Sequence, residues 1–204
     1  MSISPAALEA AHLIDRLERL TRAGDAPGGI NPAQWEALRY LARANRFSRT
    51  PAALADYLAS TRGTVSRTLA SLESKGYVAR MPNPRDGRSV DFALTAQAQK
   101  ALRRDPLKAM AEDIDRALRQ DAADLVDRLK RTLGTAIARN QGRAFGACAS
   151  CRHFCPQAHA AAAAPHHCRL LDVPLSDKDS LAICVEQEPA AMPPSRAAGR
   201  AAMP

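Results

Sequence analysis

The chain has 204 residues, enough for one domain of about 100–150 residues and an additional segment but few for two conventional domains. Hydrophobic residues make up 46% of the sequence and aromatic residues only 4%, so we expect a modest, Ala-rich and mainly helical core. No stretch reaches the roughly 20 consecutive apolar residues of a membrane span, and residues 1–5 lack the pattern of a signal peptide. We therefore expect a cytoplasmic protein without a membrane partner.

Positive charge is confined to the first part of the chain. Residues 1–143 hold 24 Lys and Arg against 16 Asp and Glu, whereas residues 144–204 hold five of each. The net charge of +8 therefore belongs entirely to residues 1–143. Such an excess is typical of proteins that bind nucleic acid.

Cysteine has the opposite distribution, because none occurs before residue 148 and four of the five histidines lie in the same late segment. In a reducing cytosol this clustering indicates metal binding or redox chemistry rather than disulfides. We therefore divide the chain into a basic part at 1–143, a Cys-rich part at 144–188 and a tail at 189–204. The tail is rich in Ala, Pro and Arg, so we expect it to be disordered.

The basic part is predicted to be mainly helical. Apolar residues recur at spacings of three and four, Asn31-Pro32 and Thr50-Pro51 are typical helix starts, and Gly76 suits a helix end. Two short alternating segments around a turn-rich connector predict a β-hairpin. In chain order we expect helices at 5–22, 31–44, 51–58 and 61–75, strands at 77–81 and 89–94, a helix from 95 to 118 that is divided at 105–106, and a last helix at 121–139.

Residues 54–67 fit a helix-turn-helix. Small Ala55 lets the two helices approach closely, 59–60 forms the tight turn, and Val65 points into the shared core. The start of the second helix then offers short or cationic side chains to the major groove of double-stranded DNA and to its phosphates. The residues predicted to bind DNA here are Thr61, Arg62, Gly63, Thr64, Ser66 and Arg67.

The hairpin that follows has an Arg-rich tip. We expect Asp86 to orient one arginine while another enters the minor groove, which makes Arg85, Asp86 and Arg88 further DNA-binding candidates. Residues 46–90 hold eight basic side chains and three acidic ones. Charge, recognition helix and hairpin therefore all favour DNA binding.

Residues 1–143 resemble the MarR family of winged-helix regulators, in the run 64–69, in 72–78 and in the wing pattern of Asp86, Arg88 and Ser89. The resemblance implies an obligate homodimer, built from the N- and C-terminal helices, on a pseudo-palindromic operator. The sequence favours a dimer independently, because the first and last helices carry more apolar surface than one small domain covers. Those apolar positions are Leu8, Leu13, Ile14, Leu17, Leu125, Leu129 and Leu133.

The Cys-rich part offers four thiolates, at Cys148, Cys151, Cys168 and Cys184. Their spacing is similar to that of high-potential [4Fe–4S] proteins, although the aromatic residues that this family places near its last cysteine are absent. We expect these four to hold an iron–sulfur cluster, either [4Fe–4S] or [2Fe–2S]. The alternatives are zinc, bound by the same four thiolates or with His166 or His167 replacing one, and a redox switch of uncoordinated thiols.

Two smaller expectations concern the same part of the chain. Cys155 stands outside the spacing of the other four, so it is a further candidate ligand, a separate reactive thiol or a loop thiol without a role. Residues 172–175 are expected to form a turn and a small apolar cap over the metal site.

The sequence thus favours a dimeric transcriptional regulator, more a repressor than an activator, whose DNA affinity follows the state of a metal centre. One alternative is the same regulator with structural zinc and a small-molecule effector. Another is an electron-transfer protein with a helical scaffold. We do not expect an enzyme, because no catalytic triad, phosphate loop or carboxylate pair is present in the sequence.

Overall fold

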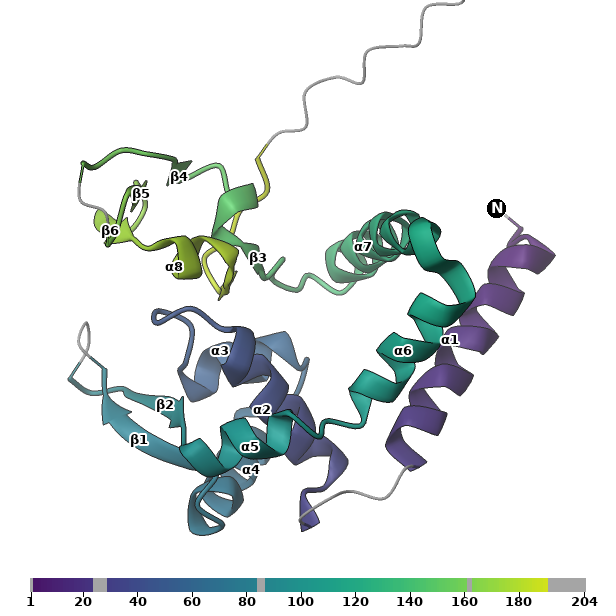
Figure 1. Cartoon of the computed structure of the whole chain (residues 1–204), viewed down its shortest axis with the longest axis horizontal. Helices are drawn as coiled ribbons and strands as arrows, with labels where there is room; N and C mark the ends of the chain where they lie inside the picture. The colour runs from purple at the N-terminus through teal and green to yellow at the C-terminus, as the bar shows by residue number, and fades with distance from the viewer. Residues whose placement is uncertain (1, 24–28, 84–86, 161–162, 191–204) are drawn as a thin grey trace, which may run out of the picture. The chain divides into compact units, whose positions relative to one another are not determined.

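The computed structural model describes residues 2–23, 29–83, 87–160 and 163–190 (Figure 1). The chain forms two compact units, Met1–Gly142 and Arg143–Pro204, and their boundary lies one residue from the one that charge and cysteine content suggest. The wing-tip residues Arg85 and Asp86 and most of the expected tail lie outside the described residues.

Six elements of the first unit form a winged helix, as predicted. Three helices precede a two-stranded antiparallel hairpin, and a short helix follows it (Figure 1). In chain order they are α2 (Pro32–Arg43), α3 (Pro51–Tyr57), α4 (Arg62–Ser74), β1 (Val78–Pro82), β2 (Val90–Leu94) and α5 (Ala96–Leu102).

Side-chain caps set where these helices begin. Asn31 and Gln34 form a capping box at the start of α2, with hydrogen bonds of 2.9 and 3.1 Å. The hydroxyls of Thr50, Thr61 and Thr95 accept the backbone N–H three residues further on, at 3.1–3.2 Å, before α3, α4 and α5. Each such cap contributes about 1 kcal/mol.

The end of α4 directs the chain into the hairpin. Gly76 has φ +75°, its N–H donates to the carbonyl of Glu73 and the N–H of Tyr77 donates to the carbonyl of Leu72, both at 2.9 Å. These two bonds form the Schellman motif that typically ends a helix, so the predicted role of Gly76 is confirmed.

The core of the winged helix lies where α2, α3, α4 and β2 meet. Its apolar side chains are at most 3% exposed and include Trp35, Leu38, Leu41, Leu54, Val65, Leu69, Leu72 and Phe92. Strands β1 and β2 pair from Val78↔Leu94 to Pro82↔Val90. The N–H of Phe92 also donates to the carbonyl of Arg49 at 3.0 Å, which ties the segment before α3 to the hairpin.

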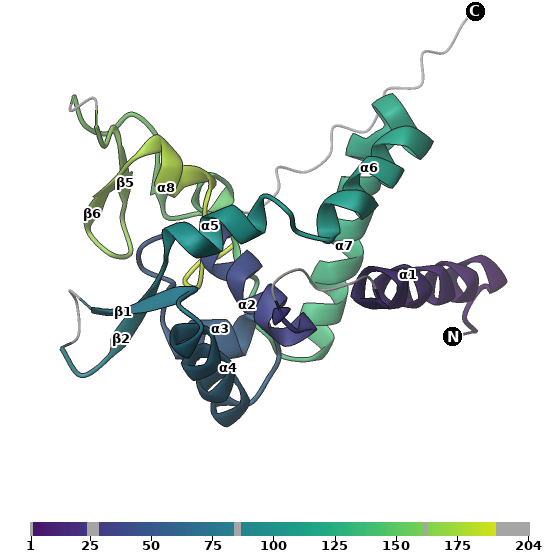
Figure 2. The same cartoon turned by 60° about the horizontal axis from the view of Figure 1, so that its bottom comes forward.

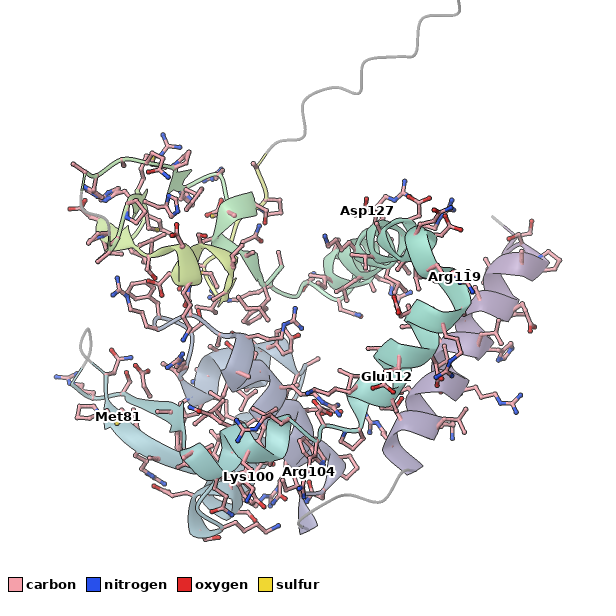
Figure 3. All side chains as sticks on the ribbon, viewed as in Figure 1. Met81, Lys100, Arg104, Glu112, Arg119 and Asp127 are labelled. Atoms are coloured by element: carbon pink, nitrogen blue, oxygen red, sulfur yellow. The ribbon has the colours of Figure 1, made fainter. Side chains whose placement is uncertain are left out.

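The remaining helices of this unit are α1 (Pro5–Ala23), α6 (Leu107–Leu118), a 3₁₀ turn η2 (Arg119–Asp121) and α7 (Ala122–Arg139). Figure 2 shows α1 and the α6–α7 pair projecting from the winged helix. The break between α5 and α6 falls at Asp105-Pro106, as predicted. Figure 3 labels Glu112 on α6, Arg119 at η2 and Asp127 on α7, and it labels Lys100 on α5 and Arg104 just after this helix.

The helices α1, α6 and α7, here called the arm, leave large apolar side chains half exposed. Leu8, Leu13, Ile14 and Leu17 of α1 are 48–52% exposed, and Leu129 and Leu133 of α7 are 42% and 59% exposed. No described residue of α6 or α7 is buried. None of the described helices has the length and hydropathy needed to cross a membrane.

The second unit is built from very short elements. Strand β3 pairs with β7, and β4, β5 and β6 form a separate antiparallel sheet in that order. The elements are β3 (Gly146–Ala147), η3 (Cys148–Ser150), β4 (Phe154–Cys155), β5 (His166–Cys168), β6 (Val173–Leu175), α8 (Asp177–Leu181) and β7 (Ile183–Cys184). We expected an irregular extension with a turn and a small apolar cap at 172–175. The structure places Asp172 in a turn, with φ +52°, and forms strand β6 from Val173–Leu175, in which Leu175 is buried.

Candidate DNA interface and cysteine cavity

The first half of α4 presents polar and basic side chains to solvent. On its opposite face Val65, Leu69 and Leu72 are at most 2% exposed and anchor the helix in the core. One face of α4 is therefore fixed while the other is available to a DNA groove. All six predicted contact residues are exposed, namely Thr61, Arg62, Gly63, Thr64, Ser66 and Arg67.

The turn between α3 and α4 is tight, as predicted. Ala55 is 2% exposed, and its carbonyl accepts the N–H of Ser60 at 3.0 Å. Ala59 adopts φ +48°, a left-handed conformation that costs a residue with a Cβ about 1 kcal/mol. The two helices of the motif are thereby brought close together at the expense of local strain.

The base of the wing is held by a buried carboxylate. Asn83 Nδ2 donates to Asp91 Oδ1 at 2.9 Å, and Asp91 is 8% exposed. Burial raises the pKa of Asp91, while the hydrogen bond from Asn83 and the charge of Arg49 act against this rise. Arg88 is exposed beside the wing tip.

Arg80 and Lys75, which are among the eight basic side chains counted in residues 46–90, contact neighbouring elements. Arg80 Nε lies 2.9 Å from Glu73 Oε2, and its guanidinium lies 5.6 Å from the centre of the Phe92 ring. Lys75 Nζ donates to Gln34 Oε1 at 3.0 Å. These contacts join the hairpin and α2 to α4, a role that a count of charges does not reveal.

In the second unit, one narrow cavity is lined by four of the five cysteines. These are the four predicted ligands, Cys148, Cys151, Cys168 and Cys184. Cys148 and Cys184 are buried and the other two are partly exposed. The rest of the lining comprises His153, Phe154, Leu170, Leu175 and Glu186.

The fifth cysteine lies on the other side of its strand. In the register of β4 and β5, Phe154 is paired with Cys168 and Cys155 with His167. Successive strand residues point to opposite faces, and Phe154 and Cys168 both line the cavity, so Cys155 points away from it. The structure therefore separates Cys155 from the other four thiols.

The sequence did not suggest which histidine lies at the cavity. His166 accepts the N–H of Gln157 at Nδ1 and places Nε2 2.9 Å from Asp177 Oδ1. Neither His166 nor His167, the two that we considered as zinc ligands, is in the cavity lining, whereas His153 is. Since His153 lies between the cysteines without a ligand spacing of its own, no sequence signal marked it.

The described residues contain no preformed metal-ion site, since no group of three or more His, Cys, Asp or Glu side chains is arranged to hold a metal ion. The five cysteines are not joined in disulfides.

A second cavity, of about 380 Å³, lies in the first unit among α1, α2, α6 and α7. Trp35 lines it, and the buried Nε1 of Trp35 has no hydrogen-bond partner among the described residues. Arg39, also in the lining, is held by Asp105 at 2.6 Å. Most other lining side chains are apolar and include Ile14, Leu17, Leu107, Met110, Ile114, Leu125 and Leu129.

A helix-turn-helix with an exposed polar and basic second helix, followed by a two-stranded wing, defines a winged-helix DNA-binding protein. Comparison with known proteins agrees. Residues 28–89 match the MarR family. An HTH-type transcriptional regulator of Mycobacterium tuberculosis is 33% identical over 120 residues, which cover 54% of this chain and 82% of the relative, and a regulator of Mycobacterium bovis matches equally well.

Solved structures show the same fold. A MarR transcriptional regulator from Methanosarcina mazei is 26% identical, with a TM-score of 0.52, over 63% of this chain and 96% of its own. The S. aureus MepR–DNA complex shares the fold at 19% identity and a TM-score of 0.53, over 65% of this chain and 96% of its own. The chain belongs to the MarR family, and these named relatives are transcriptional regulators rather than enzymes.

Proposed function

We propose that the protein is a homodimeric repressor that binds a pseudo-palindromic operator, and that an iron–sulfur cluster in its cysteine unit sets its DNA affinity. The exposed face of α4 beside the wing carries the DNA-binding part of this proposal. The cavity lined by four cysteines carries the cluster part.

The apolar surface of the arm supports a dimer. Ile14 of α1 is 49% exposed and Leu133 of α7 is 59% exposed. Both helices also carry charged residues that face solvent, so apolar side chains are exposed in addition to the polar ones. Contiguous apolar surface of this kind is stable only when it is covered. A second copy that presents the same helices covers it with two-fold symmetry, which also gives the two recognition helices that a palindrome requires.

Repression follows from where such a dimer sits. Each α4 enters a major groove with Arg62 and Arg67 beside the phosphates, and each wing lies over the adjacent backbone. An operator within a promoter is then inaccessible to RNA polymerase. The S. aureus MepR relative was solved as a DNA complex, which supports this mode of binding.

The thiol arrangement favours iron–sulfur over zinc. Structural zinc sites commonly use two pairs of ligands that are close in sequence. A cluster needs only that its cysteines meet in space, so single cysteines far apart in the sequence can serve. The cavity is lined by one close pair, Cys148 and Cys151, and by two single cysteines, Cys168 and Cys184, which suits a cluster better than an ion.

The chain connects the cluster directly to the dimer helices. After α7 ends at Arg139, only six residues precede β3, which leads into Cys148 and pairs with the strand that carries Cys184. Arg143 in this connection lies 3.3 Å from Glu186 Oε2 in the cavity lining. A change in the cluster is therefore transmitted to the end of α7 through a short, bonded segment.

Selection of duplexes from a random pool by the full-length protein tests the DNA-binding part. A homodimer should select two inverted half-sites whose centres are about 10 bp apart or a multiple of this, because both recognition helices must face the same side of the duplex. A single half-site would contradict the dimer, and no duplex binding at low salt would favour the electron-transfer alternative.

A matched pair of variants tests the cluster part. Anaerobically purified wild-type protein should be brown and absorb near about 400 nm. Cys168→Ala should lose iron and colour, whereas Cys155→Ala, which alters a thiol on the opposite face, should keep both. Equal loss in both variants, or a colourless wild-type protein that contains zinc, would contradict the assignment.

The cavity in the first unit supports a second candidate, in which structural zinc holds the cysteine unit and a small molecule controls DNA binding. Its volume of about 380 Å³ is within the usual range for ligand sites, and Trp35 Nε1 is a buried donor without a partner among the described residues. This candidate gains support if Cys168→Ala leaves DNA affinity unchanged while an apolar ligand with a hydrogen-bond acceptor weakens it in wild type but not in Trp35→Phe.

A further inference from the structure

The second unit has almost no aliphatic core. Among its described residues, the buried apolar side chains are Cys148, Leu175, Ile183 and Cys184, so two of the four are thiols from the cavity. The winged helix, by contrast, buries many Leu, Val, Trp and Phe side chains. Burial of two aliphatic side chains recovers far less free energy than the ordering of nearly fifty residues requires.

Local structure does not compensate for this small core. The strands of the unit contain two or three residues each and α8 contains five. A two-stranded pair, a three-stranded sheet with strands of two or three residues and a single helical turn are not stable without a hydrophobic core to pack against. Independently folded segments of this size normally depend on disulfides or a metal, and the five cysteines form no disulfide.

The four thiols occupy the places where a crosslink has most effect. Cys184 lies on β7 and Cys148 directly follows β3, in the smaller sheet, whereas Cys168 lies on β5 in the other sheet. Cys151 is bridged to Pro189 close to the end of the described chain. One group bound to all four would join both sheets and the two ends of the unit.

The distribution of the thiols also bears on the size of that group. Cys148 and Cys151 are close in sequence, but Cys168 and Cys184 come from different sheets and offer no second local pair. A [2Fe–2S] rhomb requires two thiolates on each iron, whereas a [4Fe–4S] cube takes one thiolate at each of its four irons. One local pair and two single cysteines from different sheets fit the cube better.

We infer that the cavity takes a [4Fe–4S] cluster bound by Cys148, Cys151, Cys168 and Cys184, and that this cluster is the core around which residues 143–190 fold. The inference rests on the proposed assignment of these four cysteines as cluster ligands. On binding, each thiol loses its proton and becomes an iron-bound thiolate. Removal of the cluster therefore unfolds the second unit and leaves the winged helix folded.

Hydrogen exchange and limited trypsin digestion of the full-length protein test this inference. Four samples are compared. They are cluster-loaded wild type, cluster-free wild type, and the variants Cys168→Ala and Cys155→Ala. The cluster-free sample is prepared with a chelator and an oxidant and is then re-reduced with excess thiol. Iron and sulfide are measured in each sample. Residues 30–102 act as an internal reference because their core contains no cysteine.

The loaded protein should contain about four iron and four sulfide per chain. Cleavage after Arg152 and Arg169 should be at least about tenfold faster in the cluster-free and Cys168→Ala proteins than in loaded wild type, because it follows the population of the open form. Amides of 143–190 should exchange faster in parallel, while those of 30–102 should not change. Cys155→Ala should behave as wild type.

Each contrary outcome identifies what fails. If the cluster binds but the cluster-free protein stays protected in 143–190, the folding inference is wrong and the proposed function stands. Two iron and two sulfide per chain would overturn the [4Fe–4S] assignment alone. Zinc, or no metal at all, would overturn this inference together with the cluster part of the proposed function.

Discussion

Replacement of Arg67 by Ala should change the salt dependence of DNA binding by an amount set by dimer symmetry. Arg67 is exposed on the polar face of α4, two residues after the buried Val65, so the substitution removes a charge without altering the core. A dimer carries two copies of α4 and therefore loses two phosphate contacts. The slope of log affinity against log salt should then become shallower by about 1.8, because each contact contributes about 0.9.

This slope predicts a measurable ratio. Between 50 and 200 mM salt, the affinity advantage of wild type over Arg67→Ala should shrink by about twelvefold. Fluorescence anisotropy on a selected operator measures both proteins. Arg116→Ala is the control, because Arg116 is 76% exposed on α6 and pairs with Asp113 away from α4. Parallel salt lines for Arg67→Ala and wild type would refute the placement of α4, and a change of about 0.9 would refute the dimer.

Three other substitutions test separate parts of the structure. Ala59→Gly should raise the free energy of unfolding by about 0.5–1 kcal/mol because it relieves a positive φ, whereas Ala70→Gly inside α4 should lower it by a similar amount; equal signs in denaturant melts would contradict the turn geometry. Asp91→Asn should stabilise the fold at neutral pH. Because burial raises the pKa of Asp91, its stabilising contribution is present below the unfolded pKa and is lost as pH rises through the folded pKa. The melting curves of variant and wild type should therefore converge in acid, and a less stable variant at pH 7 would count against this. Leu133→Glu should shift the protein toward monomer in analytical ultracentrifugation, while Leu181→Glu, at an even more exposed leucine of the second unit, should not; an unchanged dimer would remove α7 from the interface.

The winged helix could be predicted in detail because its signals are local. Asn31, Thr50 and Thr61 each provide a side chain that caps the next helix, and proline at the first helical position follows two of them. Gly76 ends α4 for an equally local reason. The apolar periodicity of α4 also separates Val65 from Arg67 without any knowledge of the tertiary structure.

The partners of long side chains could not be predicted in this way. Arg80 and Arg67 are both exposed and are equivalent in a count of charge, yet Arg80 forms an ion pair with Glu73 on the neighbouring helix, which the count does not reveal. Lys75 is likewise directed back toward Gln34. Such pairs depend on the packing of α2, α4 and the hairpin, which the sequence pattern does not encode locally.

The four cysteines that line one cavity could be singled out from the sequence, whereas the fold of the cysteine unit could not. Strands of two or three residues are shorter than the four or more needed to detect alternation, so the segment looked irregular. The separation of Cys155 from Cys168 depends on the register of β4 with β5, and the position of His153 in the cavity lining depends on the path of the chain. Both are properties of tertiary structure.

The central claim, that the cluster sets DNA affinity, is tested most directly by one titration performed twice on a single anaerobic preparation. Affinity for a selected operator is measured with the cluster bound, and again after the cluster is removed and the thiols are re-reduced. The account predicts a change of at least about tenfold, equivalent to about 1.4 kcal/mol of coupling, in wild type and in Cys155→Ala alike. Equal affinity before and after cluster removal would contradict the account.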